Sequence, residues 1–146
     1  MRTAAARTVV AAVLLVPGCS GDDELPAVQV SAVPTAAAAA CARFADRLPS
    51  ELGDGQRRRD TVPADPHVAA YGDPPIVVRC GAPRSTVYQS GDQLFTVNGV
   101  AWFAERRPGV VVWSLPRAFV NVEVTIPEPL TGDRLAALTE AVNATR

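Results

Sequence analysis

Alternating apolar and polar residues mark the second half of the chain and predict β-strands there. In the segment 119–127 every second residue is Val or Ile, and Phe119, Asn121, Glu123 and Thr125 stand between them. A period of two places the aliphatic side chains on one face of a strand, so that one face is buried and the other is wet. The runs at 75–80 and 110–115 are also predicted as strands.

A β-hairpin is the most specific local prediction. Asn98-Gly99 separates two apolar runs, which is the preferred composition of a two-residue hairpin turn. The turn fixes the register: Val97 lies opposite Val100, Thr96 opposite Ala101, Phe95 opposite Trp102 and Leu94 opposite Phe103.

Helical spacing occurs near both ends of the chain. In the alanine-rich segment 35–48, Thr35 is placed to cap a helix. The segment 131–144 has Thr131 or Asp133 at its start. The residues expected on the inner faces of the two helices are Ala37, Cys41, Phe44 and Leu48, and Leu135, Leu138 and Val142.

These elements predict one α+β domain at 35–146. We expect an antiparallel β-meander of about four to six strands, with the N-terminal and C-terminal helices packed on one face. No internal repeat and no break in composition indicates a second unit.

The N-terminus has the pattern of an export signal. Arg2 and Arg7 precede an apolar run at 9–16, and the sequence VPGC ends at Cys19. The run is shorter than the roughly 20 residues that a membrane-spanning helix needs. We therefore predict a signal peptide at 1–18 and, because the end resembles a bacterial lipobox, lipidation of Cys19. Pro17 departs from the commonest lipobox, and the alternatives are cleavage with release or an uncleaved anchor.

Residues 19–34 are predicted to be the lipidated cysteine and a flexible tether, since they are acidic at first and then interrupted by proline. A short edge strand at 28–30 is the alternative for part of this segment.

The chain has three cysteines, so lipidation of Cys19 leaves two, Cys41 and Cys80, that can pair with each other. Cys41 lies on the inner face of the first helix, and Cys80 shares a strand face with Ile76 and Val78. An even number of cysteines in an exported protein favours a bridge, so we predict a Cys41–Cys80 disulfide.

The chain has 14 basic residues, all of them Arg, and 15 acidic residues, which gives a net charge of −1. This charge gives no general reason to expect a nucleic acid as partner. The run Arg57, Arg58 and Arg59 is open to two interpretations. It either contacts phosphate groups of anionic lipid or wall polymer, or forms a solvated loop tip beside Asp54 and Asp60.

No arrangement of residues typical of catalysis is present. The single histidine, His67, lies in a proline-bounded segment, so a cysteine nucleophile has no recognisable base. One histidine and two cysteines do not make a usual zinc site, and no glycine-rich phosphate loop occurs. We expect no enzyme activity, no metal and no cofactor.

A binding role has more to support it. An exposed aromatic residue beside an arginine could hold a glycan or a peptide. The candidates are Trp102, Trp113, Arg79, Arg84 and Arg117. For each a structural role is the alternative: core packing for the tryptophans, a surface ion pair for Arg79 and a turn for Arg117. A concave pocket with Trp113 and Arg117 would favour a small ligand, and a flat apolar patch would favour a protein.

Several segments in this order resemble the actinobacterial domain of unknown function family 3515. They are the alanine-rich helix with Cys41, then GDPPIVVRCG, VNGVAWF, PRAFVNVEVTIP and the closing helix. The resemblance covers about residue 30 to the end. It implies an exported or membrane-attached envelope protein, often a lipoprotein, and no defined activity.

Together these features predict a cell-envelope lipoprotein on the outer face of the cytoplasmic membrane. We expect a non-catalytic binding or assembly module, whose partners are the membrane through its lipid and an envelope protein or cell-wall ligand. The alternative is a secreted or membrane-anchored domain that binds a small glycan or peptide.

Overall fold

The computed structural model describes residues 25–146. The predicted signal peptide, Cys19 and the first part of the tether lie outside the described residues.

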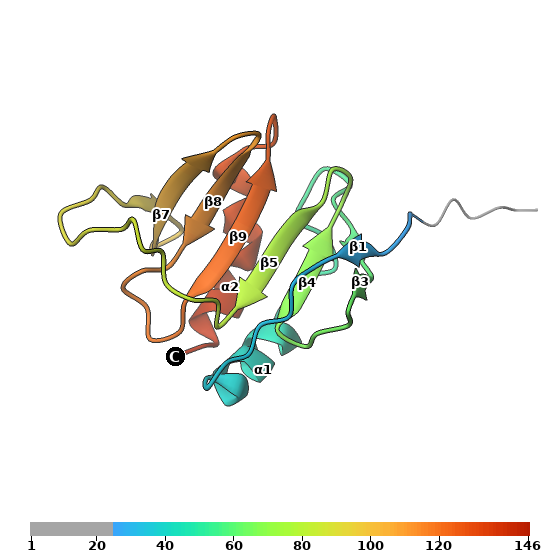
Figure 1. The fold of residues 1–146 in the computed structure, drawn as a ribbon, viewed down its shortest axis with the longest axis horizontal. Coiled ribbons are helices and arrows are strands. Elements are labelled where there is room, and N and C mark those ends of the chain that lie inside the picture. Colours follow the sequence, from blue (N-terminus) through green and yellow to red (C-terminus); the bar gives the residue numbers. More distant parts are fainter. Residues whose placement is uncertain (1–24) are drawn as a thin grey trace, which may run out of the picture.

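Seven strands form one antiparallel sheet in the order β2-β4-β5-β9-β8-β7-β6, and β1 pairs with β3 in a separate parallel pair (Figure 1). The strands are β1 Val28–Gln29, β2 Arg58–Arg59, β3 Thr61–Val62, β4 Val68–Tyr71, β5 Ile76–Cys80, β6 Phe95–Val97, β7 Val100–Arg107, β8 Val110–Ser114 and β9 Val122–Pro127. The helices are α1 Ala38–Asp46, the 3-10 helix η1 Gly132–Leu138 and α2 Thr139–Asn143.

The α+β class is confirmed, and so are three of the four predicted residue pairs of the hairpin; the fourth, Leu94 with Phe103, falls outside β6, which begins at Phe95. In the hairpin, Val97 pairs with Val100, Thr96 with Ala101 and Phe95 with Trp102. Asn98 and Gly99 have φ values of 46° and 79°, which is the left-handed backbone that an Asn-Gly turn supplies at low cost.

The predicted meander of four to six strands is wrong, because the main sheet has seven strands and β5 lies next to β9 rather than next to β6. Two of the additional strands lie in the proline-rich region before residue 75. β2 has only two residues, and all four residues of β4 are buried, so neither shows an alternating pattern.

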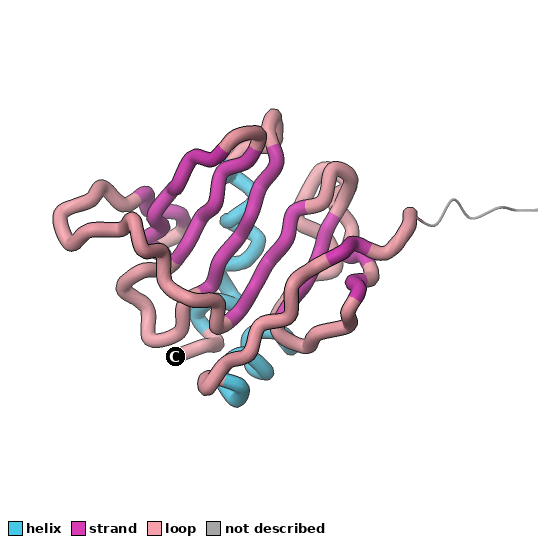
Figure 2. Tube along the Cα trace, in the orientation of Figure 1, coloured by secondary structure: helices cyan, strands magenta, loops and turns pink. Residues whose placement is uncertain are grey.

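Both helices are shorter than predicted. The Oγ1 atom of Thr35 accepts a hydrogen bond from the backbone N–H of Ala37, which makes a turn before α1 begins at Ala38. The C-terminal segment begins as the 3-10 helix η1 and becomes α-helical only at Thr139. Figure 2 shows these helical segments behind the sheet.

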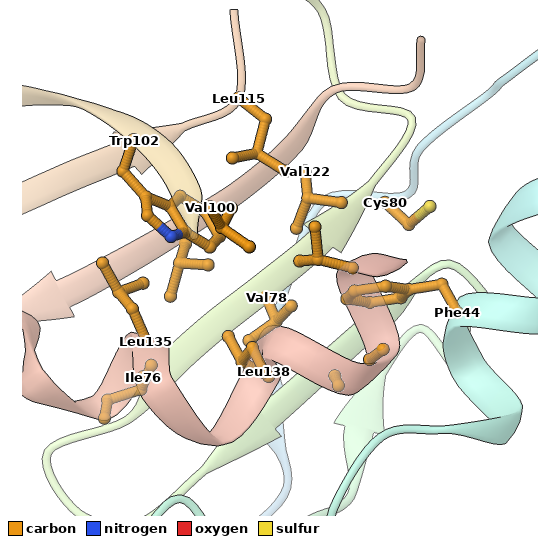
Figure 3. Close-up of a cluster of buried hydrophobic side chains, with 14 of the residues drawn as sticks. Phe44, Ile76, Val78, Cys80, Val100, Trp102, Leu115, Val122, Leu135 and Leu138 are labelled. Atoms are coloured by element: carbon orange, nitrogen blue, oxygen red, sulfur yellow. The ribbon is translucent and has the colours of Figure 1, made fainter. Parts of the chain in front are cut away.

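One hydrophobic core joins the helices to the sheet (Figure 3). Ile76, Val78 and Cys80 of β5 are fully buried, as the alternation predicted. Phe44 of α1 and Leu138 of η1 belong to the same cluster. The core therefore depends on segments from both ends of the chain.

The disulfide between Cys41 and Cys80 is confirmed. It joins α1 to β5, with the two Cα atoms 5.5 Å apart and 39 residues of sequence separation. Both cysteines are completely buried, so the bridge lies inside the core.

Residues 28–33 belong to the domain, which corrects their assignment to the flexible tether. The structure has the short strand that was the alternative for this segment, because β1 at Val28–Gln29 pairs with β3. Val33 is 2% exposed, and its N–H donates to Asp65 at 2.7 Å. Figure 1 shows this segment crossing in front of β4, whereas the helices lie behind the sheet. It accounts for the burial of Val68 and Ala70, which face away from the main core.

The ionised carboxylate of Asp65 holds this N-terminal segment in place by accepting the hydrogen bond from Val33. Burial raises the pKa of Asp65, but hydrogen bonds from the backbone N–H groups of His67 and Val33, with the charges of His67 and Arg79, outweigh burial and lower the pKa. The carboxylate therefore remains a charged acceptor at neutral pH.

Reduction of the disulfide should lower the free energy of unfolding by about 4 kcal/mol, because the unfolded chain regains the entropy of a loop of this length. Denaturant titrations of the full chain with and without reductant measure the difference. The C41A/C80A variant serves as the control, because reductant should not change its stability. Equal stability of the oxidised and reduced wild-type chains would contradict a stabilising role for the bridge.

Candidate binding surface

The two tryptophans considered as binding residues both lie on the helix side of the sheet. Trp102 is completely buried in the core. Trp113 is partly buried, and its ring makes an edge contact with Phe95 at 5.6 Å between centroids. A Cβ atom added to Gly132 would lie 2.6 Å from the Trp113 ring, so the absence of a side chain at residue 132 lets η1 pack over the indole.

Arg79 lies on the opposite face of the sheet. It donates to Glu123 at 3.1 Å, and both side chains are mostly buried. Glu105 is on the same face, where it accepts from Arg107 at 2.7 Å and from the hydroxyl of Ser85. The pKa of Glu105 is lowered, mainly by the hydrogen bond from Arg107. Burial raises this pKa, but the hydrogen bond from Ser85 lowers it further. These side chains form a row of ion pairs in which both glutamates act as acceptors.

Arg84 holds the loop between β8 and β9. Its Nη1 donates to the carbonyls of Pro116 at 2.6 Å and Leu115 at 3.4 Å. Its Nη2 donates to those of Ala118 at 2.6 Å and Phe119 at 3.3 Å. One guanidinium therefore contacts four carbonyls of a five-residue stretch. The planar fork of Arg suits this task, and the single ammonium of Lys would not replace it.

Arg117 makes the reciprocal contact. It projects from the same loop and donates to the hydroxyl of Tyr88 at 2.8 Å and to the carbonyl of Ser90 at 3.1 Å. Asn121 adds a buried link, since its Nδ2 donates to the carbonyls of Ala82 and Pro83. The segments 82–90 and 115–121 are thus fastened to each other in both directions, and we call them the clasped loops.

Phe119 is the most exposed large apolar residue among residues 25–146, with 86% of its surface accessible. The alternating pattern of the sequence places it on the wet face of the last strand, and it was not among the predicted site residues. β9 begins only at Val122, so Phe119 belongs to the loop. The signal that could have found it is the sequence PRAF, in which an aromatic residue follows a proline between two strands.

A cavity of about 300 Å³ lies beside Phe119. Its walls come from the clasped loops, the hairpin turn and the C-terminus, and include Val100, Leu115, Arg117, Phe119 and Arg146. Trp113 is not among the residues that line it. The cavity shared by Trp113 and Arg117 that was considered from the sequence therefore does not occur, and Phe119 is the aromatic residue that lines the cavity together with Arg117.

Residues 25–146 contain no cluster of His, Cys, Asp and Glu side chains suited to a metal ion. In the same part of the chain no helix is both long and apolar enough to cross a membrane.

A family model described as "Protein of unknown function (DUF3515)" matches residues 3–146. The chain belongs to the DUF3515 family. No curated protein and no solved structure matches it. Family membership defines no activity, so the role of this DUF3515 protein has to be argued from its geometry.

The variant R84Q should loosen the clasped loops, because four carbonyls lose a charged donor. We expect the free energy of unfolding to fall by about 1–2 kcal/mol, which is comparable to a single hydrogen bond to a charged group, because water can replace the donor at these largely exposed carbonyls. Hydrogen exchange at the Ala118 amide, which bonds to the Leu115 carbonyl, should become faster. R106Q on β7 is the control, and equal effects of the two variants would show that Arg84 does not fix the loop.

Proposed function

We propose that this protein is a non-catalytic binding module of the cell envelope, lipid-anchored through Cys19, that contacts a partner protein through the clasped loops. The observation that carries the proposal is Phe119. It is 86% exposed on a loop whose backbone is held by four hydrogen bonds from one arginine. Single exposed apolar residues are common on protein surfaces, but one that is held on a fixed loop beside a cavity is suited to anchor an interface.

The rigidity of the loop supports binding rather than accidental exposure. Ordering a flexible loop on association costs affinity, and a loop that is already fixed avoids that cost. Burial of one phenylalanine in a partner's pocket contributes about 2 kcal/mol. Arg117 on the same loop adds a charged group at the rim.

The positions of the two ends of the domain support an envelope orientation. In Figure 1 the described chain enters at the right, next to β1, whereas the clasped loops and the C-terminus lie at the left. A domain anchored through residues before Leu25 would present Phe119 away from the membrane. The disulfide is compatible with an exported protein, because such bridges persist in oxidising compartments.

A small ligand is the second candidate, and the cavity of about 300 Å³ favours it. The volume lies at the lower end of the range for ligand sites. Arg146 and Phe119 at its wall would suit a short glycan or a peptide with a carboxylate.

Photo-crosslinking in the native host distinguishes these functions. We expect a benzophenone amino acid at position 119 to give one discrete adduct with an envelope protein. The same probe at position 62 should not give it, because Val62 is also exposed but lies at the tether end. The variant F119S should remove the complex and change stability by less than about 0.5 kcal/mol.

Identical adducts at positions 119 and 62, or an undiminished complex in F119S, would contradict the protein interface. A small ligand would leave no protein adduct at position 119, and its binding would be weakened by R146Q.

A further inference from the structure

The two edges of the seven-stranded sheet differ in their protection against pairing with another chain. β2 ends the sheet on one side and consists of Arg58 and Arg59. Its outer edge is occupied, because the N–H of Arg58 donates to the carbonyl of Ser50 at 2.8 Å. Charged residues and a covering segment are the usual protection of an edge strand. The β2 edge is therefore closed.

β6 ends the sheet on the other side without this protection. Phe95 and Thr96 are exposed, Val97 is half-buried, and the strand contains neither a charged residue nor proline. Its only strand partner within residues 25–146 is β7. The strand has three residues, so it offers one short stretch of backbone to a partner.

The register of the hairpin shows which backbone groups of β6 are free. The two-residue turn makes Val97 and Val100 a hydrogen-bonded pair, and such pairs alternate along an antiparallel ladder. Thr96 belongs to a non-hydrogen-bonded pair, so its N–H and C=O point away from β7. Within residues 25–146 the backbone of Thr96 bonds to the backbone of no turn or loop. One donor and one acceptor therefore point outward from the edge.

The sequence of β6 is self-complementary about Thr96. When an identical strand lies antiparallel with its own Thr96 opposite, the two threonines exchange both N–H···O=C hydrogen bonds. Phe95 of each copy then lies opposite Val97 of the other, and aromatic and β-branched residues are favourable cross-strand partners. β6 has no charge that would meet a like charge in this register. The same pairing through β2 would bring arginines together.

From this geometry we infer that the protein forms a two-fold dimer in which β6 pairs antiparallel with β6 of a second copy, centred on Thr96. Because β2 closes the opposite edge of the main sheet, each copy offers one edge, and pairing ends at two copies rather than in a fibre. The contact is small, so the dimer is weak in dilute solution and is favoured where anchored copies share one membrane. That last point rests on the proposed lipid anchor.

Cysteine crosslinking of the full chain in the membranes of its host tests the pairing. In T96C the two introduced thiols lie on opposite residues whose Cα atoms are about 5.5 Å apart, within reach of a disulfide. Q93C is the matched control, because residue 93 is also exposed but its two copies would lie roughly 20 Å apart along the strands. After mild oxidation, peptide mass mapping should show at least tenfold more link between two copies of position 96 than between two copies of position 93.

Sedimentation of the purified full chain in detergent supplies a test without new thiols. T96K places two ammonium groups opposite each other at the centre of the interface and should lower the association constant at least tenfold. A39K adds the same charge on the exposed side of α1 and should leave the association constant unchanged. Denaturant unfolding at low protein concentration should be the same for both variants, which separates loss of pairing from loss of folding.

Equal links from T96C and Q93C, or no link from T96C, would overturn the inference, and so would a dimer that persists in T96K. A dimer that is lost in F119S but kept in T96K would show that self-association uses the clasped loops instead. Neither experiment requires the partner protein of the proposed function, so failure of the dimer is distinguishable from failure of that proposal.

Discussion

The disulfide between Cys41 and Cys80 is the constraint on which the rest of the domain depends. α1 has nine residues and buries only Ala40, Cys41 and Phe44, which is too little for a short helix to remain in place by itself. The covalent link fixes α1 to β5, which lies next to β9 in the sheet. Because the bridge is buried in the core, its reduction would remove a constraint on the whole domain, and an oxidising compartment would preserve that constraint.

The two ends of the domain are held in place by different contacts. The N-terminal segment, fastened by β1 and by Asp65, lies at one end. The clasped loops lie at the other end, where Arg84, Arg117 and Asn121 hold two long connections together. Side-chain hydrogen bonds join the two loops to each other, and Phe119 on one of them remains exposed.

The sequence was most informative where one local rule determined the outcome. The Asn98-Gly99 turn set the register of the hairpin, and the period of two set the buried face of β5 and β9. The bridge could be predicted because Cys41 and Cys80 both lie on inward faces and are the two cysteines left once Cys19 is assigned to the lipid. The α+β class followed from the order of these elements.

The remaining features depend on contacts between residues distant in sequence. β2 and β4 show no alternation, and residues 28–33 are held by partners more than 30 residues away. At the candidate surface, Arg84 and Arg117 were considered as ligand-binding residues, but their partners are loop carbonyls and the hydroxyl of Tyr88. No local pattern distinguishes an arginine that binds a ligand from one that fastens a loop. Phe119 was missed because the alternating pattern continues through it, whereas β9 begins only at Val122 and the buried side chain of Asn121 bonds to the carbonyls of Ala82 and Pro83.

The central claim is a disulfide-stabilised domain tethered through its N-terminus, and the intact mass of the chain from the host's membrane fraction tests it most directly. Thiols would be alkylated before and after reduction. We predict a mature chain that begins at Cys19, carries acyl mass, and is alkylated at Cys41 and Cys80 only after reduction. An unacylated chain, or alkylation of Cys41 and Cys80 without reduction, would contradict the account.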